Sequence, residues 1–418
     1  TLREDDRAAV ESLILEEIGR HNRRRVHVLG EEALSAAQRE ALFEGVRDAV
    51  WGAGRLQRLL DRTDLEDIMI RGCDVVWLHK ADGTVERGEP VAETDEQLIR
   101  DLQTLAQTNP NGERRFGPAD PRLDLALPGG HRLSASMEIT HRPCVTIRFH
   151  RYTHIDLARL EQLGSIDPTL RQFLSASIRA GKSIVIAGLP AAGKTTNARA
   201  MLNELDPKTP IATIETEFEL FLHEMPDRHQ NVWAAQARKG GEDGAGEITL
   251  GDLIEASLRQ SVDRIVVGEV RGKEILPMLA AMQAGKGSVS TIHAGNAEDA
   301  IRRMVACALE AGVPREFAIS QVTGAIDLII YADSIDERQI GGKKHRFISE
   351  VIAIEPSAEE GSGGVAVTHL FTPDETGRAV PTGILPPWEH QLRLVGYDTG
   401  WLTSRYSAWP PIDLITRR

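Results

Sequence analysis

The chain has 418 residues, of which 41% are hydrophobic and 27% charged, so it can bury a substantial core and is not disordered overall. Asp and Glu outnumber Lys and Arg by 62 to 49, and the net charge of −13 argues against a nucleic-acid scaffold, which normally has a basic surface. Three widely spaced cysteines argue against a disulfide framework or a cysteine zinc site, and no run approaches the roughly 18 apolar residues of a membrane helix.

The first 150 residues predict a helical arm followed by a compact α+β module. Apolar residues recur at helical spacing from Val10 to Ile18, and this register continues through most of residues 1–50. Strand-like runs and turn signals then replace it, interrupted by one capped helix over residues 94–107. We therefore assign residues 1–50 to the arm and residues 51–150 to the module.

The remainder of the chain begins with a polar stretch at residues 151–157, the predicted linker, and continues as a strand–helix alternation over residues 158–355. This alternation is typical of an α/β fold with a mostly parallel sheet and helices on both faces. The predicted strands are 183–187, 210–214, 264–268, 288–292 and 326–331, and the predicted helices are 195–205, 249–260, 272–284 and 296–311. A hairpin-like run at 344–355 closes this domain, and the Gly-, Pro- and Trp-rich residues 356–418 predict an irregular tail.

A phosphate-binding motif lies at the start of the alternation. Residues Gly188–Thr195 match G-x-x-x-x-G-K-[ST] between a predicted strand and a predicted helix, the context that this motif requires. Glycines let the backbone fold round phosphates with its N–H groups pointing inward, and the helix N-terminus adds its positive end. The Lys194 ammonium would reach the β- and γ-phosphates, whereas Pro190 removes one N–H from the loop. The predicted nucleotide-binding residues are Gly188, Ala191, Ala192, Gly193, Lys194, Thr195 and Thr196.

Three other predicted strands end in side chains suited to acid–base or metal chemistry. They are Glu215 and Glu219 after the strand at 210–214, Glu269 after 264–268 and His293 after 288–292. Because ligands bind at the carboxyl ends of parallel strands, we expect these side chains to lie beside the loop. Glu269 and the Thr195 hydroxyl would hold Mg²⁺. Either Glu215 or Glu219 would polarise the attacking water, and His293 would sense the γ-phosphate.

Each of these residues also has an ordinary structural explanation. A single Glu after a strand is most often a favourable charge at a helix start, and a single His is more often structural than catalytic. Arg238 and Arg271 are candidates for stabilising phosphate charge, although a single arginine is more often a surface residue. The combination with a phosphate-binding loop is what favours a catalytic site.

Several further motifs occur in a fixed order along the chain. They are DIMI at 67–70, TIRF at 146–149, TIETEFEL at 213–220, GEITLGDL at 246–253, RIVVGEVRG at 264–272 and STIHAG at 290–295. With this set, roughly residues 45–355 resemble the secretion-motor ATPases of type II and type IV secretion and type IV pili. The resemblance is greatest to the Tad/Flp-pilus (CpaF-type) branch.

The resemblance implies a hexameric ATPase, with a RecA-like P-loop motor domain, an N-terminal PAS-like sensing module and nucleotide clamped between the two. It implies ATP and Mg²⁺ as cofactors. It assigns the active site to Lys194, Thr195, Glu215, Glu219, Glu269 and His293, with Arg148 and Arg238 reaching the phosphates. The chain departs from the family pattern at Ala191, Ala192, Thr216, Ser261 and Lys286.

The resulting hypothesis is a cytoplasmic homo-hexamer, peripheral at the inner face of the cell membrane. It would couple ATP hydrolysis to assembly or retraction of a Tad-type pilus, or to secretion, by docking on inner-membrane platform proteins. No direct nucleic-acid partner is expected. Two alternatives stay open: a nucleic-acid translocase with a similar RecA-like site, and a nucleotide-gated scaffold with little turnover.

Overall fold

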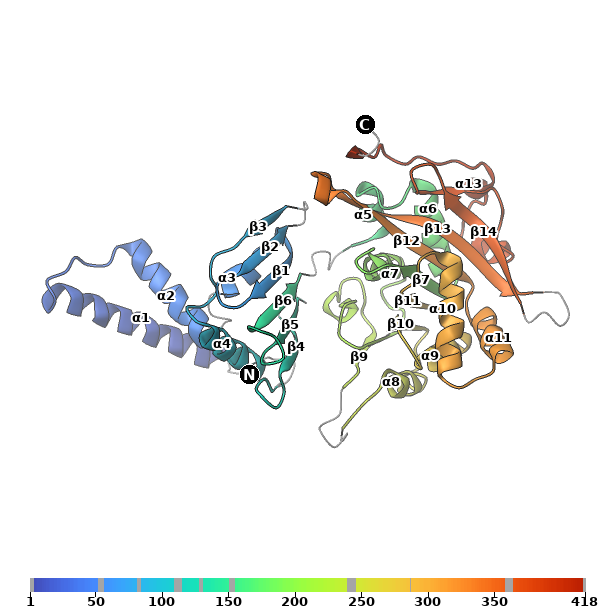
Figure 1. The fold of residues 1–418 in the computed structure, drawn as a ribbon. Coiled ribbons are helices and arrows are strands. Elements are labelled where there is room, and N and C mark those ends of the chain that lie inside the picture. The colour runs from blue at the N-terminus through green and yellow to red at the C-terminus, as the bar shows by residue number, and fades with distance from the viewer. Residues whose placement is uncertain are drawn as a thin grey trace. The chain divides into compact units, whose positions relative to one another are not determined.

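The chain forms two compact units, Thr1–Arg151 and Tyr152–Arg418, in a computed structural model (Figure 1). The structure describes residues 4–51, 56–80, 84–108, 115–127, 131–149, 155–238, 246–285, 287–357 and 364–415. Asp82 and Gly83 form a dipeptide that is typical of a turn between strands, and they lie outside the described residues. The same holds for most of two stretches that are rich in glycine, at 239–246 and 359–364.

The N-terminal unit combines two long helices with an antiparallel sheet. The helices α1 (Glu4–His27) and α2 (Ala36–Trp51) lie against each other and form the predicted helical arm. The sheet has the strand order β3-β2-β1-β6-β5-β4. The other elements of this unit are α3 (Gln57–Leu60), β1 (Leu65–Arg71), β2 (Val76–Lys80), β3 (Val85–Arg87), α4 (Asp95–Thr108), β4 (Arg122–Ala126), β5 (Arg132–Ser136) and β6 (Cys144–Arg148).

Burial alternates along the strands of this sheet, so one face of the sheet forms a core. Along β6, Val145 and Ile147 are buried, and they belong to one apolar cluster with Leu98 and Leu102 of α4. A period of two is expected for a sheet with one covered face. This arrangement confirms the predicted α+β class of the module.

The second unit is built on one large mixed sheet. Its strand order is β15-β14-β13-β12-β7-β11-β10-β8-β9, parallel from β12 to β9 and antiparallel from β12 to β15. Its strands are β7 (Ile184–Gly188), β8 (Ile211–Glu215), β9 (Val232–Gln236), β10 (Arg264–Val270), β11 (Ser288–Ile292), β12 (Leu328–Asp336), β13 (Lys344–Pro356), β14 (Val365–Pro373) and β15 (Ala379–Pro381).

Helices cover both faces of this sheet. The α-helices are α5 (Leu157–Gln162), α6 (Pro168–Arg179), α7 (Lys194–Leu202), α8 (Leu250–Ser257), α9 (Ile275–Ala284), α10 (Ala297–Glu310), α11 (Arg315–Ala325), α12 (Glu389–Leu394) and α13 (Gly400–Thr403). Short 3₁₀ turns occur at η3 (Leu222–Glu224) and η4 (Arg338–Ile340).

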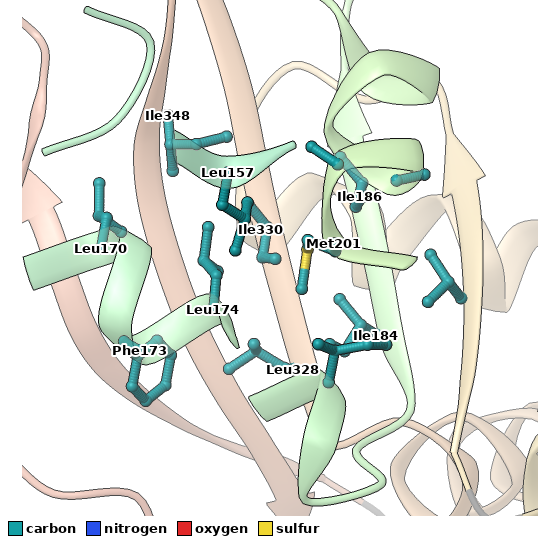
Figure 2. Packing of buried hydrophobic residues seen from close by; sticks show 14 of the residues in the cluster. Leu157, Leu170, Phe173, Leu174, Ile184, Ile186, Met201, Leu328, Ile330 and Ile348 are labelled. Atoms are coloured by element: carbon teal, nitrogen blue, oxygen red, sulfur yellow. The ribbon is translucent and has the colours of Figure 1, made fainter. Parts of the chain in front are cut away.

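Successive residues of β7 show how the two cores are divided. Ile184 and Ile186 pack with Leu174 of α6 and Met201 of α7 (Figure 2). Val185, between them in sequence, belongs to the other cluster, which α8 to α11 cover. A central strand buried on both faces reads as a continuous apolar run, which explains why the sequence pattern located it. The doubly covered, mostly parallel sheet confirms the predicted fold class.

Two predictions for the C-terminal region are wrong. The run at 344–355 is not a hairpin but the single strand β13, which pairs with β12 on one side and β14 on the other. The tail after residue 356 is not irregular throughout, because β14 and β15 extend the sheet. The polar Thr368 and His369 interrupt the apolar pattern of β14, and strand formation here depends on a partner that local sequence does not reveal.

Candidate functional site

The phosphate-binding motif forms the connection between β7 and α7. Gly188 ends β7 at φ +157°, and a Cβ at this position would lie 2.4 Å from the Ala332 carbonyl oxygen, so only glycine fits. Gly193 precedes α7 in the left-handed region, at φ +94°. The helix then starts at Lys194, which directs its N-terminal amides and positive dipole end toward the loop.

A chain of polar contacts links Lys194 to the ends of two other strands. Its Nζ donates to the Leu189 carbonyl at 3.2 Å and lies 3.1 Å from His293 Nδ1. His293 Nε2 lies 2.6 Å from Glu269 Oε1. Because an ammonium group only donates, this network assigns the acceptor role to Nδ1 and the proton to Nε2, which donates to Glu269.

Burial lowers the pKa values of Lys194 and His293 in this network of contacts. Lys194 is 8% exposed, and desolvation lowers the pKa of its ammonium. The pKa of His293 is also lowered, first by burial and then by the positive charge of Lys194. The Arg271 side chain pairs with the other oxygen of Glu269, with its Nε 2.7 Å from Oε2. A neutral His293 therefore lies between a cation and an ion-paired carboxylate.

A second group of contacts holds the acidic loop that follows β8. The Thr195 hydroxyl donates to Glu219 Oε2 at 2.8 Å. Glu215 Oε1 accepts from the backbone N–H groups of Glu219 and Leu220, each at 3.0 Å. From the other side, Arg199 of α7 donates to the carbonyl oxygens of the same two residues, at 2.9 Å for Leu220. The loop is thus held at its amides and its carbonyls, and this fixes Glu219 beside Thr195.

The structure brings together six residues that the sequence singled out: Lys194, Thr195, Glu215, Glu219, Glu269 and His293. The predicted nucleotide contacts Ala192 and Thr196 lie on either side of Lys194, the first buried and the second on the first turn of α7. The two predicted phosphate-binding arginines have other partners. Arg238 donates to the Gly246 carbonyl of its own loop at 2.7 Å, and Arg148 lies in the N-terminal unit, where it pairs with Asp67 at 3.0 Å.

The residues around Thr195 fit a magnesium ion, and the contacts add Glu219 to the predicted pair Thr195 and Glu269. Thr195 contacts Glu219, whereas Glu269 is engaged by His293 and Arg271. A hydroxyl and a carboxylate are hard oxygen donors, and Mg²⁺ usually takes one or two of these together with waters and substrate phosphates. Such an ion needs no larger cluster, and the described residues contain no group of three His, Cys, Asp or Glu side chains that could hold a metal.

Sequence reasoning missed two arginines at this site. Arg199 braces the acidic loop, and Arg346 of β13 donates from Nε to the Ala191 carbonyl of the phosphate-binding loop at 2.9 Å. Arg199 lies five residues after Lys194 on a helix that the motif already predicted, so the sequence could have indicated that it lies close to the loop. Arg346 is 155 residues from Ala191, and no local pattern connects the two.

The fold and the loop together define a P-loop domain of the RecA-like α/β type. The chain belongs to the family described as type II/IV secretion system protein, whose model matches residues 67–375. A candidate conjugal transfer protein of Mycobacterium tuberculosis is 33% identical over 290 residues, which cover 67% of this chain and 80% of the relative. The type IV secretion system protein PtlH of Bordetella pertussis is 27% identical over 320 residues, covering 70% of this chain and 91% of PtlH.

A solved structure supports the fold assignment. The Legionella pneumophila ATPase DotB aligns with a TM-score of 0.51 and 17% identity, over 73% of this chain and 80% of DotB. These similarities confirm the predicted secretion-motor superfamily and its fold. Within the described part of the chain, none of the helices has the length and apolar character that crossing a membrane requires.

The carboxyl group of Glu215 gives the folded domain a measurable pH dependence. Glu215 is 2% exposed, and burial raises its pKa from 4.5 to about 7. The folded protein therefore keeps this proton in a pH range where the unfolded chain has lost it, and its stability falls as pH rises from about 4.5 to 7. Replacing Glu215 with Gln removes the ionisation and keeps an oxygen acceptor for the two amides.

We expect Glu215→Gln to become progressively more stable relative to wild type as pH rises through this interval. The gain is at most about 1.4 kcal/mol per pH unit, and no further change is expected below pH 4.5. Urea titrations of both proteins at four or five pH values measure the difference. A difference in unfolding free energy that stays constant with pH would contradict a buried, protonated Glu215.

Proposed function

We propose that the protein is a P-loop ATPase that hydrolyses ATP with Mg²⁺ and uses the reaction to drive a secretion or pilus machine. One observation carries the proposal. The phosphate-binding lysine, the helix-start threonine and the polar ends of β8, β10 and β11 form one connected site. The names of related proteins, a type IV secretion system protein and an ATPase, agree with this function.

The contacts suggest a role for each residue in the reaction. When the β- and γ-phosphates enter the loop, Lys194 would exchange the Leu189 carbonyl and His293 for phosphate oxygens. The Thr195 hydroxyl, with Glu219 close by, would hold Mg²⁺, which would supply positive charge against the phosphates. Glu219 is also the better placed carboxylate for orienting the attacking water, because Glu215 is buried and accepts backbone amides.

The other two strand-end residues would act on the γ-phosphate side of the site. Glu269 holds the His293 ring in one tautomer, so that Nδ1 faces Lys194 and responds when the lysine moves to a phosphate. Arg148 and Arg238 stay candidates for stabilising transition-state charge. Both would have to leave their present partners, Asp67 and the Gly246 carbonyl, to reach a nucleotide.

The assembly and the cellular setting are part of the same proposal. We infer a homo-hexamer that works in the cytoplasm and associates with the membrane only through inner-membrane platform proteins. The motif set supports the Tad/Flp-type branch, and we propose that the protein acts there in pilus assembly, pilus retraction or secretion. Direct nucleic-acid binding is not expected for a chain with a net charge of −13.

A phosphate-release assay on the full chain tests the activity. We expect hydrolysis of ATP that requires Mg²⁺, stops with excess chelator and does not change when single- or double-stranded DNA is added. Stimulation by DNA would favour a nucleic-acid translocase instead. Tight ATP binding without phosphate release would favour a nucleotide-gated scaffold. The departures from the family pattern motivate this alternative, among them Ala191 and Ala192 in the loop.

A further inference from the structure

The middle of the phosphate-binding loop is a tight turn built from unusual residues. The Ala192 N–H donates to the Leu189 carbonyl at 3.2 Å, which closes a four-residue turn with Pro190 and Ala191 at its centre. Ala191 has φ +59°. Proline followed by a residue of positive φ is the pattern of a type II turn, in which glycine is strongly preferred at the Ala191 position.

This turn gives the loop two handicaps as a phosphate cradle. Pro190 has no N–H to offer to a phosphate, so the remaining amides of the loop must do more of the binding. Ala191 carries a Cβ in a backbone region that non-glycine residues adopt only at a cost in free energy. A loop of this composition needs an outside contact to hold it in one conformation.

Arg346 supplies such a contact from a distant part of the chain. Its Nε donates to the Ala191 carbonyl at 2.9 Å, and a Cβ built on Gly193 would lie 3.8 Å from its Cδ. The side chain therefore runs along the second half of the loop. A charged donor on a carbonyl makes a stronger hydrogen bond than a neutral one.

The sheet register explains why Arg346 reaches the loop. In β12, Ala332 pairs with Gly188 at the end of β7 and with Ile348 of β13. Because β13 runs antiparallel to β12, Arg346 lies opposite Ser334, two residues past the level of Gly188. The start of β13 thus projects beyond the carboxyl edge of the parallel sheet, where the phosphate-binding loop lies.

We propose that Arg346 is a positioning residue for nucleotide binding. It holds the Leu189–Ala192 turn in the conformation that presents the loop amides to the phosphates, and so offsets the missing N–H of Pro190 and the strain at Ala191. The proposal rests on the proposed function, since it concerns how the same loop binds a nucleoside diphosphate or triphosphate.

Binding of a fluorescent ADP to the full chain tests this role, compared across four proteins. We expect Arg346→Gln to weaken ADP binding about tenfold, the effect of losing one charged hydrogen bond. Arg338→Gln is the matched control, because this variant loses the same charge at a position just before β13. Arg338 pairs with Asp336 at the end of β12 and not with the phosphate-binding loop. We expect this control to stay within about twofold of wild type.

Glycine at the strained position separates positioning from a merely structural role. Ala191→Gly removes the cost of positive φ, so in the Arg346→Gln background it should restore at least about half of the lost affinity on a logarithmic scale. For each variant we measure the melting temperature without ligand and its increase on addition of ADP. A purely structural defect lowers the melting temperature but leaves the increase unchanged.

Three outcomes would overturn the inference. The first is ADP affinity of Arg346→Gln equal to that of Arg338→Gln, and the second is a double variant as weak as Arg346→Gln alone. If Arg346→Gln does not fold, Arg346→Lys replaces it in the experiment, because it keeps the charge without the Nε donor. The third outcome is wild-type ADP affinity in Arg346→Lys. Failure of the wild-type chain to bind ADP would instead refute the proposed nucleotide-binding function.

Discussion

We expect Lys194→Ala to abolish measurable ATP hydrolysis and to weaken nucleotide binding strongly. Lys194 is the cation at the start of α7, and its buried ammonium faces the loop in which the phosphates would lie. Its neighbours Gly193 and Thr195 carry no charge that replaces it. Removing one preorganised charge donor costs a rate factor of about 10² to 10³. Because Lys194 would also bind the phosphates in the ground state, its loss should weaken nucleotide binding as well.

Loss of activity in this variant is separable from unfolding. Burial lowers the pKa of Lys194, so in the absence of phosphate the folded state holds this charge at a cost, and alanine should not lower the melting temperature substantially. Lys208→Ala, which removes a charge from an exposed position, is the matched control for phosphate release. Wild-type turnover by Lys194→Ala would refute the assignment of the active site.

Much of the motor fold is predictable because its strands are short, apolar and buried on both faces. The run at 183–187 was recognisable as β7, and the strand-end rule then placed Glu215, Glu269 and His293 near one another. This rule works without knowledge of strand order, since every parallel strand delivers its carboxyl end to the same edge. The cluster of polar side chains was therefore foreseeable.

The contacts of the individual carboxylates and arginines were not foreseeable, because they join side chains from separate segments of the chain. Glu269 looked like the metal residue from its place after an apolar strand, yet His293 and Arg271 engage it, and Glu219 contacts Thr195 instead. Arg346 reaches the loop only through the antiparallel pairing of β13 with β12. Such pairings are set by tertiary context and leave no periodic signal in the sequence.

The second large effect is expected at the acidic loop, where Glu219→Gln should retain ADP binding and slow hydrolysis by about 10²-fold or more. The glutamine keeps an oxygen that can accept from the Thr195 hydroxyl, so the loop geometry should persist. What is lost is the negative charge, which favours Mg²⁺ and polarises the attacking water. The same variant should therefore need a higher Mg²⁺ concentration, by about tenfold, for half-maximal binding of a fluorescent ATP analogue.

Glu269→Gln is the comparison that distinguishes the two carboxylates. Its carboxylate contacts His293 and Arg271 rather than Thr195, so we expect slower hydrolysis with an unchanged Mg²⁺ requirement for nucleotide binding. Magnesium titrations of ATP-analogue binding to wild type and both variants measure this difference directly, whatever their turnover. If Glu269→Gln shifts the Mg²⁺ requirement and Glu219→Gln leaves it unchanged, Glu269 is the metal residue that the sequence pattern first indicated, and the contact between Thr195 and Glu219 has no part in holding the ion.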